Sequence, residues 1–158
     1  MGTFSVNDIV ESAVQIEKNG TAFYKKVSEI AGTPELERFF MALAHEEIKH
    51  QEIFENILNG LKPQVLHETY EGEYDIYLDA LVKEHVFTRE DEIALSECAV
   101  DVHRNNKALG YAIAFEKDTI LFFHEMKKYL RGKNEEIIMQ LIEEEKKHII
   151  RLREKKED

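Results

Sequence analysis

Two short segments of the sequence place a glutamate three residues before a histidine. They read AHEEIKH and IEEEKKH, and the pairs are Glu47 with His50 and Glu145 with His148. On a helix, residues three apart lie on the same side, so each pair could bind one metal ion through a carboxylate oxygen and an imidazole nitrogen. Oxygen and nitrogen ligands without thiolate suit iron or manganese better than copper(I) or structural zinc.

Apolar residues flank both pairs at helical spacing. Leu43 and Phe54 flank the first pair, and Leu141 and Leu152 flank the second. A helix face with this pattern should enter the core of the protein. A core excludes an acid and an imidazole unless they are paired or bound to a metal, so the pattern favours a buried metal site.

Two further segments carry a single glutamate on an apolar helix face. Glu17 lies in QIEKNGTAFY and Glu116 in AFEKDTILFF, and in each segment Glu-Lys is followed after four residues by Phe and a second aromatic residue. These glutamates are 99 residues apart, and the two Glu-x-x-His motifs are 98 apart. The two parts of the chain therefore look like repeats of one helical hairpin.

Four carboxylates buried together would repel each other and lose their hydration. Two divalent cations would balance their charge, with two neutral imidazoles as additional ligands. Helical bundles with carboxylate-bridged di-iron or di-manganese centres use this ligand set. The alternative is that each Glu-x-x-His pair lies on an exposed charged face, but the repetition in register on apolar stripes favours the metal site.

The elements that must position these residues are helices. The chain has 158 residues with only two prolines and seven glycines, and 34% charged and 43% hydrophobic residues, which is typical of a soluble amphipathic bundle. Ser5 and Asp8 can begin a first helix that ends before Gly32. Thr33-Pro34 can begin a second helix that ends near Gly60.

The sequence from residue 61 onward predicts a crossover segment followed by a second helical hairpin. Residues 61–104 include a short helix over 74–87 and the start of another at 88–91, and long helices follow over about 107–131 and from Asn134. We therefore predict an all-α fold and a single domain, 1–158. Two antiparallel hairpins, 5–60 and 105–153, are joined by the partly helical crossover.

Bulk properties exclude several classes of function. A net charge of −11 argues against a nucleic-acid partner. The sequence has neither an apolar run long enough to span a membrane nor an export signal. Cys98 is the only cysteine, which excludes thiolate sites within one chain and indicates a reducing, cytoplasmic location.

The hairpins resemble the rubrerythrin branch of the ferritin-like di-iron proteins, through EKNGTAFY and EEIKH and their counterparts EKDTILFF and EEKKH. The resemblance covers the four long helices and implies a ferritin-like four-helix bundle with two iron ions, or manganese. It implies bridging positions for Glu47 and Glu145 and terminal positions for Glu17 and Glu116. The implied metal ligands are Glu17, Glu47, His50, Glu116, Glu145 and His148.

The sequence departs from that family in two respects. Typical rubrerythrins have an additional glutamate one turn after the ligand of the third helix, which a redox-linked metal shift uses, and here that position is Thr119. They also commonly carry a rubredoxin-like domain with paired Cys-x-x-Cys motifs, which one cysteine cannot supply. We therefore expect a separate electron donor.

Some residues allow two interpretations. Tyr24 lies on the face of Glu17, and it is either a hydroxyl group beside the metals or a core tyrosine; its counterpart in the repeat is Phe123. We expect His124 at the boundary of the core and Cys98 as a buried inert thiol. We expect the remaining polar residues of these types to be surface, crossover or solvated residues: His45, His67, His85, His103, Glu46, Glu143 and Glu144.

The functional hypothesis is an oxidoreductase that reduces peroxide or reacts with dioxygen. A ferritin-like protein for iron oxidation and storage is the alternative, and a scaffold with a vestigial site is a third hypothesis. The family resemblance also leads us to expect a homodimer.

Overall fold

The computed structural model describes residues 5–67, 70–83 and 102–156, without the side chains of 81–83 and 102–105. Within these ranges the chain is helical and forms no β-strand apart from an isolated bridge between Ser5 and Val65. The helices are α1 (Val6–Ile30), α2 (Pro34–Gly60), α3 (Glu73–Lys83), α5 (Val102–Lys127) and α6 (Lys133–Lys155). The predicted all-α fold is confirmed.

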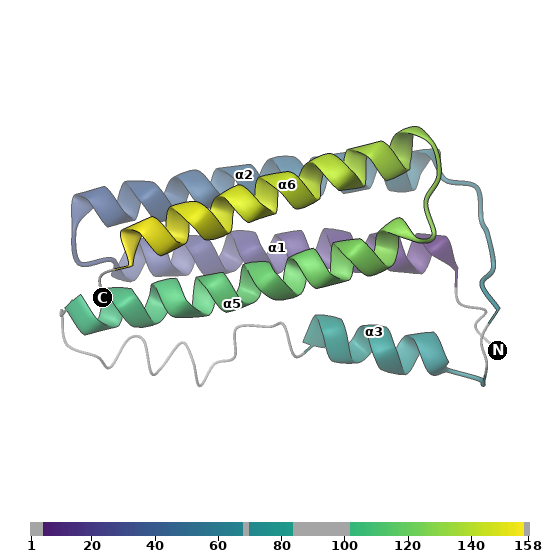
Figure 1. Ribbon diagram of the computed structural model, residues 1–158, viewed down its shortest axis with the longest axis horizontal. Helices are drawn as coiled ribbons and strands as arrows, with labels where there is room; N and C mark the ends of the chain where they lie inside the picture. The colour runs from purple at the N-terminus through teal and green to yellow at the C-terminus, as the bar shows by residue number, and fades with distance from the viewer. Residues whose placement is uncertain (1–4, 68–69, 84–101, 157–158) are drawn as a thin grey trace.

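Four long helices lie side by side as two hairpins (Figure 1). Helix α1 packs mainly on α2, and α5 packs mainly on α6. The two helices of each hairpin run in opposite directions (Figure 1). Contacts between the hairpins are much fewer and involve α1 with α5 and α2 with α6. The two predicted hairpins are therefore present.

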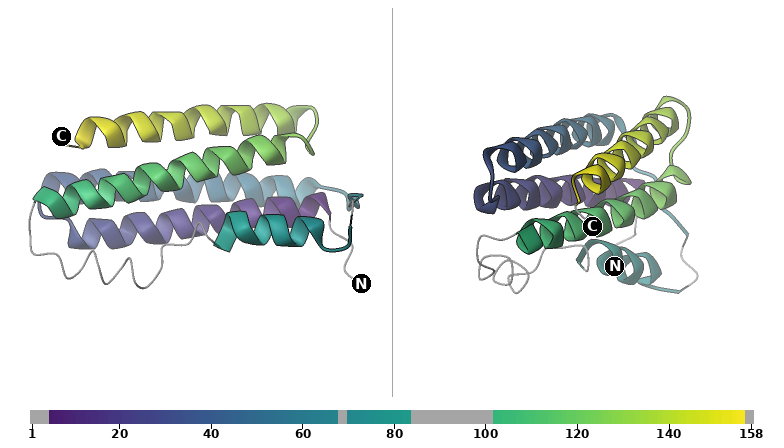
Figure 2. Two further views of the ribbon diagram at one scale, coloured as in Figure 1. Left: turned by 60° about the horizontal axis from the view of Figure 1, so that its bottom comes forward. Right: turned by 60° about the vertical axis from the view of Figure 1, so that its left-hand side comes forward.

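Helices α2 and α5 run in the same direction (Figures 1 and 2). The segment that connects α2 to α5 in the sequence must therefore run back along the bundle. Helix α3 belongs to this connection and packs on the outside of α1, where Leu78 is buried. The sequence predicted this helix over 74–87. The predicted helix start at 88–91 lies outside the described residues.

The expected caps of the first hairpin are present. The Ser5 hydroxyl accepts a hydrogen bond from the Asp8 amide, and the Asp8 carboxylate accepts one from the Ser5 amide, which is a capping box. Thr33 caps α2 through the Leu36 amide, and Pro34 occupies the first helical turn.

The predicted bounds of the second hairpin were wrong by several residues. Helix α5 ends at Lys127 instead of 131, because the amides of Lys128, Tyr129 and Leu130 bond three residues back and tighten the chain into turns. Helix α6 begins at Lys133, one residue before the predicted start at Asn134, because Gly132 adopts a positive φ of 61° and takes the N-cap position.

The core consists of two apolar clusters with a polar layer between them. One cluster includes Val10, Phe54 and Phe123, and the other includes Phe23, Leu43 and Leu109. Along each of the four long helices, the buried glutamates and histidines fall between apolar residues of these clusters. No helix of the described chain is long and apolar enough to cross a membrane.

We predict that Ser5→Ala lowers the free energy of unfolding by about 1 kcal/mol, because the first turn of α1 loses its side-chain cap. Chemical denaturation of both proteins measures the difference. Ser5→Thr keeps the hydroxyl and serves as the control. Equal stability of Ser5→Ala and the parent protein would contradict a stabilising capping box.

Candidate metal centre

The structure brings the six predicted ligands together in the middle of the bundle. Each of the four long helices contributes at least one of them: Glu17 from α1, Glu47 and His50 from α2, Glu116 from α5, and Glu145 and His148 from α6. All six side chains are buried, and the four glutamates have no exposed surface. The apolar stripes around them turn these faces inward, as expected from the sequence.

The six residues form two overlapping groups. Glu17, Glu47, His50 and Glu145 form one group, and Glu47, Glu116, Glu145 and His148 form the other; within each group one ligand atom per residue lies within 4.8 Å of the others. Glu47 and Glu145 belong to both groups, which is the arrangement that bridging carboxylates require. Glu17 and Glu116 each belong to one group, as terminal ligands would.

Glu145 lies between the two imidazoles. Its Oε1 is 2.8 Å from Nδ1 of His50, and its Oε2 is 2.8 Å from Nδ1 of His148. The two imidazole rings are nearly parallel, with an interplanar angle of 13° and centroids 5.6 Å apart. Both Nδ1 atoms therefore face the carboxylates in the interior of the bundle.

The facing atoms of this cluster have no hydrogen-bond partner of normal geometry within the described part of the protein. They are both carboxylate oxygens of Glu17, Glu47 and Glu145, Oε2 of Glu116, and Nδ1 of His50 and His148. Buried polar atoms without partners are costly in a folded protein. These oxygen and nitrogen donors fit two divalent iron or manganese ions, which would satisfy the whole set at once.

Burial and the neighbouring carboxylates raise the pKa of Glu17 and Glu116. Burial raises the pKa of Glu17 well above its ordinary value, and the charge of Glu47 raises it further. Burial also raises the pKa of Glu116, and the charges of Glu145 and Glu47 add to this effect. Metal ions would therefore compete with protons for these carboxylates.

Contacts with carboxylates raise the pKa of both histidines, against the effect of burial. Burial lowers the pKa of His50, but the contact with Glu145 outweighs it and raises this pKa to about 9. Burial likewise lowers the pKa of His148, but contacts with Glu116 and Glu145 keep it far above its usual range. Burial raises the pKa of Glu145, but its contacts with both histidines outweigh burial and lower it to about 2.

Two carboxylates outside the cluster hold the histidines by their other nitrogen. His148 Nε2 donates to Glu46 Oε2 at 2.6 Å, and His50 Nε2 donates to Glu144 Oε2 at 2.8 Å. These bonds leave each Nδ1 free to bind a metal. Glu144 is exposed, as expected, and Glu46 is partly exposed, but the sequence did not predict that each would bond to a histidine. The sequence signal that could have revealed them is their equivalent position in the repeat.

The Tyr24 hydroxyl donates a hydrogen bond to Glu116 Oε1. Tyr24 is fully buried, and burial together with the charge of Glu116 raises its pKa well above the ordinary value, so the hydroxyl keeps its proton. Of the two interpretations of Tyr24, the geometry favours the hydroxyl that contacts a predicted ligand.

Gly20 and Thr119 occupy equivalent positions of the repeat beside the cluster. A Cβ atom at Gly20 would lie only 2.9 Å from Glu47 Oε2, so the glycine leaves space for that carboxylate. Thr119 is buried, and its hydroxyl donates to the carbonyl oxygen of Phe115 at 3.1 Å. Thr119 adds no carboxylate to the centre.

The described histidines His45 and His67 and the residue Glu143 do not join the cluster. His45 and His67 are exposed, as expected. His85, Cys98 and the side chain of His103 lie outside the described residues. Glu143 is exposed and forms an ion pair with Lys146.

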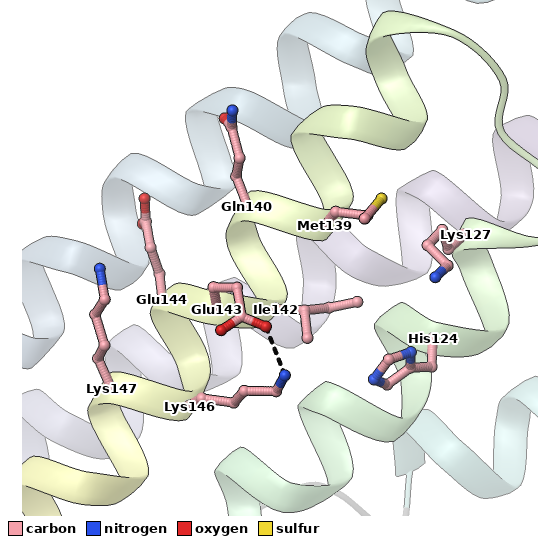
Figure 3. Close-up of a pocket in the computed structure, with 9 residues that line it drawn as sticks. All are labelled: His124, Lys127, Met139, Gln140, Ile142, Glu143, Glu144, Lys146 and Lys147. Carbon is pink, nitrogen blue, oxygen red and sulfur yellow. Dashed lines mark hydrogen bonds and ion pairs between the residues drawn. The ribbon is translucent and has the colours of Figure 1, made fainter.

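An open groove of about 430 Å³ runs between α5 and α6 (Figure 3). His124 is exposed and lines this groove with Lys127 and Met139, so it does not join the six ligands. Glu144 also lines the groove, on the outer side of α6. Among the described residues that line the groove, Glu144 is the one that bonds to a predicted ligand, His50.

Comparison with known proteins supports a metal-binding fold. The profile of the rubrerythrin family matches residues 8–103, which include Glu17, Glu47 and His50. A protein from Thermotoga maritima, whose crystal structure is described as that of a ferritin-like diiron-carboxylate protein, has a TM-score of 0.71 and 26% sequence identity. The alignment covers 99% of this chain and 97% of that one. A comparison with curated proteins gave no significant match.

We predict that the metal-free protein loses stability as the pH rises from 6.5 to about 9. A raised pKa means that the folded protein binds more protons than the unfolded one, so this contribution is complete below the unfolded pKa and is lost as the pH passes the folded pKa. His50 alone contributes about 3 kcal/mol over this interval. Glu17 and Glu116 act in the same direction.

Thermal unfolding in the presence of a chelator, repeated with manganese(II), measures this dependence. The midpoint should fall with rising pH in the metal-free protein and fall much less in the loaded one. A midpoint that is constant or rises with pH in the metal-free protein would contradict the charge arrangement described for the cluster.

We also predict that Gly20→Ala weakens metal binding by roughly tenfold, because the new methyl group displaces the Glu47 carboxylate. The helix itself should become more stable by up to about 1 kcal/mol. Calorimetric titration with manganese(II) tests the affinity. Gly60→Ala is the control, because a Cβ at that position meets no atom within 4 Å. Unchanged affinity in Gly20→Ala would show that the Glu47 carboxylate does not need this space.

Proposed function

This chain belongs to the rubrerythrin family, and we propose on that premise that it is a di-iron oxidoreductase that reduces peroxide or reacts with dioxygen. The observation that carries the proposal is the buried cluster itself. Four glutamates and two histidines from four helices direct unpartnered atoms toward one another. A purely structural bundle would fill this layer with apolar side chains.

The residues divide the work of holding two ions. Glu47 and Glu145 would bridge them, Glu17 and His50 would complete one position, and Glu116 and His148 would complete the other. Two bound iron ions supply the pair of electrons that cleavage of an O–O bond requires. Manganese is the alternative metal for the same ligands.

The surrounding side chains would keep this centre dry and oriented. Tyr24 holds Glu116 through its hydroxyl proton, and Glu46 and Glu144 hold the imidazole rings through Nε2. The apolar clusters on either side exclude water, which strengthens electrostatic interactions within the layer.

The natural reductant and the assembly are further parts of the proposal. We propose a separate electron donor, since the single cysteine of the chain cannot supply the paired Cys-x-x-Cys motifs of a rubredoxin-like iron site. Peroxide or dioxygen would be the oxidant, and nucleic acid and membranes would not be partners. We also propose a cytoplasmic location and a homodimer.

We predict that anaerobically purified protein binds two iron ions per chain, and that Glu17→Gln and Glu116→Gln each lower this content. Both substitutions keep the side-chain volume but remove a carboxylate ligand. Metal analysis measures the content, and Glu11→Gln, an exposed position on α1, is the control. Native metal content in both site variants would contradict the ligand assignment.

Mixing the anaerobic ferrous protein with peroxide tests the reaction. Oxidation should be faster with peroxide than with dioxygen, with turnover when a reductant is supplied. The alternative function, iron oxidation and storage, predicts a large cage by size-exclusion chromatography and many irons per chain. Such a result would replace the oxidoreductase proposal.

A further inference from the structure

The bonds from the histidines to the outer carboxylates repeat across the two hairpins. Glu46 of α2 accepts from His148 of α6, and Glu144 of α6 accepts from His50 of α2. Glu46 and Glu144 are 98 residues apart, as are the two histidines. The pairing is therefore reciprocal and relates the two hairpins by an approximate two-fold symmetry. Three differences between the hairpins break this symmetry.

The first difference is at Arg151. Its Nη1 donates to both oxygens of Glu46, at 2.9 and 3.0 Å, and its guanidinium carbon lies 5.9 Å from the centre of the Phe39 ring. The equivalent position of the repeat, 98 residues earlier, is Ile53, which packs against the apolar core. In the described chain Glu144 has no arginine or lysine partner.

The second difference is at Tyr24. Its hydroxyl binds Oε1 of Glu116, the lone glutamate of the second hairpin. The equivalent residue of the repeat is Phe123, which has no hydroxyl to offer. Neither oxygen of Glu17 forms a hydrogen bond within the described residues. The lone glutamate of the first hairpin is therefore held less firmly than that of the second.

The third difference is exposure. The Glu144 side chain is 50% exposed and lines the open groove on α6, whereas the Glu46 side chain is 35% exposed beneath the Arg151 guanidinium. In Figure 3 the Glu144 side chain points away from His124, on the other side of α6. In all three respects, the surroundings of Glu116 and His148 are more firmly held or less exposed than those of Glu17 and His50.

We define two halves of the centre. The closed half consists of Glu116, His148, Tyr24, Glu46 and Arg151, and the open half consists of Glu17, His50 and Glu144. We propose that the two metal positions exchange with solvent at different rates, with ions entering and leaving the open half past Glu144 while the closed half retains its ion. This proposal depends on the metal centre of the proposed function.

The physical reason is the number of bonds that must break. An ion leaving the closed half requires movement of His148 or Glu116, each of which is held by a further side chain that is itself bonded or buried. In the open half, the His50–Glu144 bond is the one restraint on the ligands from outside that the described residues provide. Outer partners of metal-binding histidines typically contribute 10-fold to 100-fold to metal affinity.

Cobalt(II) is a suitable probe, because its visible absorption reports on the ligands of each position. The metal-free protein should take up two equivalents in two kinetic phases and release them to excess chelator in two phases. Glu144→Gln should slow the fast uptake phase roughly fivefold by removing a charge that attracts the cation. Glu46→Gln, the matched control in the repeat, should leave that phase unchanged.

Variants of the closed half should act on the other phase. Arg151→Met keeps the apolar stem but frees Glu46, and should accelerate slow release by roughly tenfold. Arg151→Lys should restore much of the slow rate, because the charge pair with Glu46 is kept. Tyr24→Phe should also accelerate slow release and leave the fast phase unchanged. Thermal unfolding of the metal-free variants checks that each is folded.

The outcomes separate this proposal from the one on which it depends. Two equivalents exchanging in a single phase, or an effect of Arg151→Met on the fast phase, would overturn the inequality of the halves and leave the metal centre intact. Failure of the parent protein to bind cobalt(II) would overturn the metal centre itself, and this proposal with it.

Discussion

The burial of four carboxylates in one layer is the constraint on which the rest of the structure depends. An uncompensated buried charge costs several kcal/mol, and the bundle contains no lysine or arginine within this layer of the described chain. In the metal-free protein, burial and neighbouring carboxylates raise the pKa of Glu17 and Glu116, and contacts with carboxylates raise the pKa of both histidines. Bound divalent cations would balance the negative charge of the carboxylates instead. Metal ions and protons are therefore alternative ways of neutralising the same layer.

The sequence predicted the fold and the inner residues because both follow from periodicity. Apolar stripes specify which helix face is buried, and a glutamate on such a stripe must lie in the core wherever the helices meet. The roles of Glu46 and Glu144 could not be predicted in this way, because each bonds to a histidine on the other hairpin. That contact depends on the distance and register between α2 and α6, which no local pattern encodes. The bounds of α5 were missed because tightened turns, not a helix breaker, end it.

The two hairpins have identical residues at the ligand positions and different residues at several neighbouring positions. The two Glu-x-x-His motifs and the two lone glutamates match across the hairpins. At the equivalent positions around them the residues differ: Gly20 corresponds to Thr119, Tyr24 to Phe123 and Ile53 to Arg151. Two bound cations, as proposed, would constrain the ligands in both halves equally. The neighbouring positions are free of that constraint, so differences between the two metal environments can arise there without loss of the centre.

The distribution of contacts gives the metal a mechanical role. Each hairpin is packed extensively within itself, and the hairpins touch each other far less. Each hairpin also supplies three of the six ligands, so neither can assemble the centre alone. Bound ions would act as a cross-link between two preformed units, comparable to a disulfide between domains. Losing them would loosen the seam between the hairpins while each hairpin stays folded.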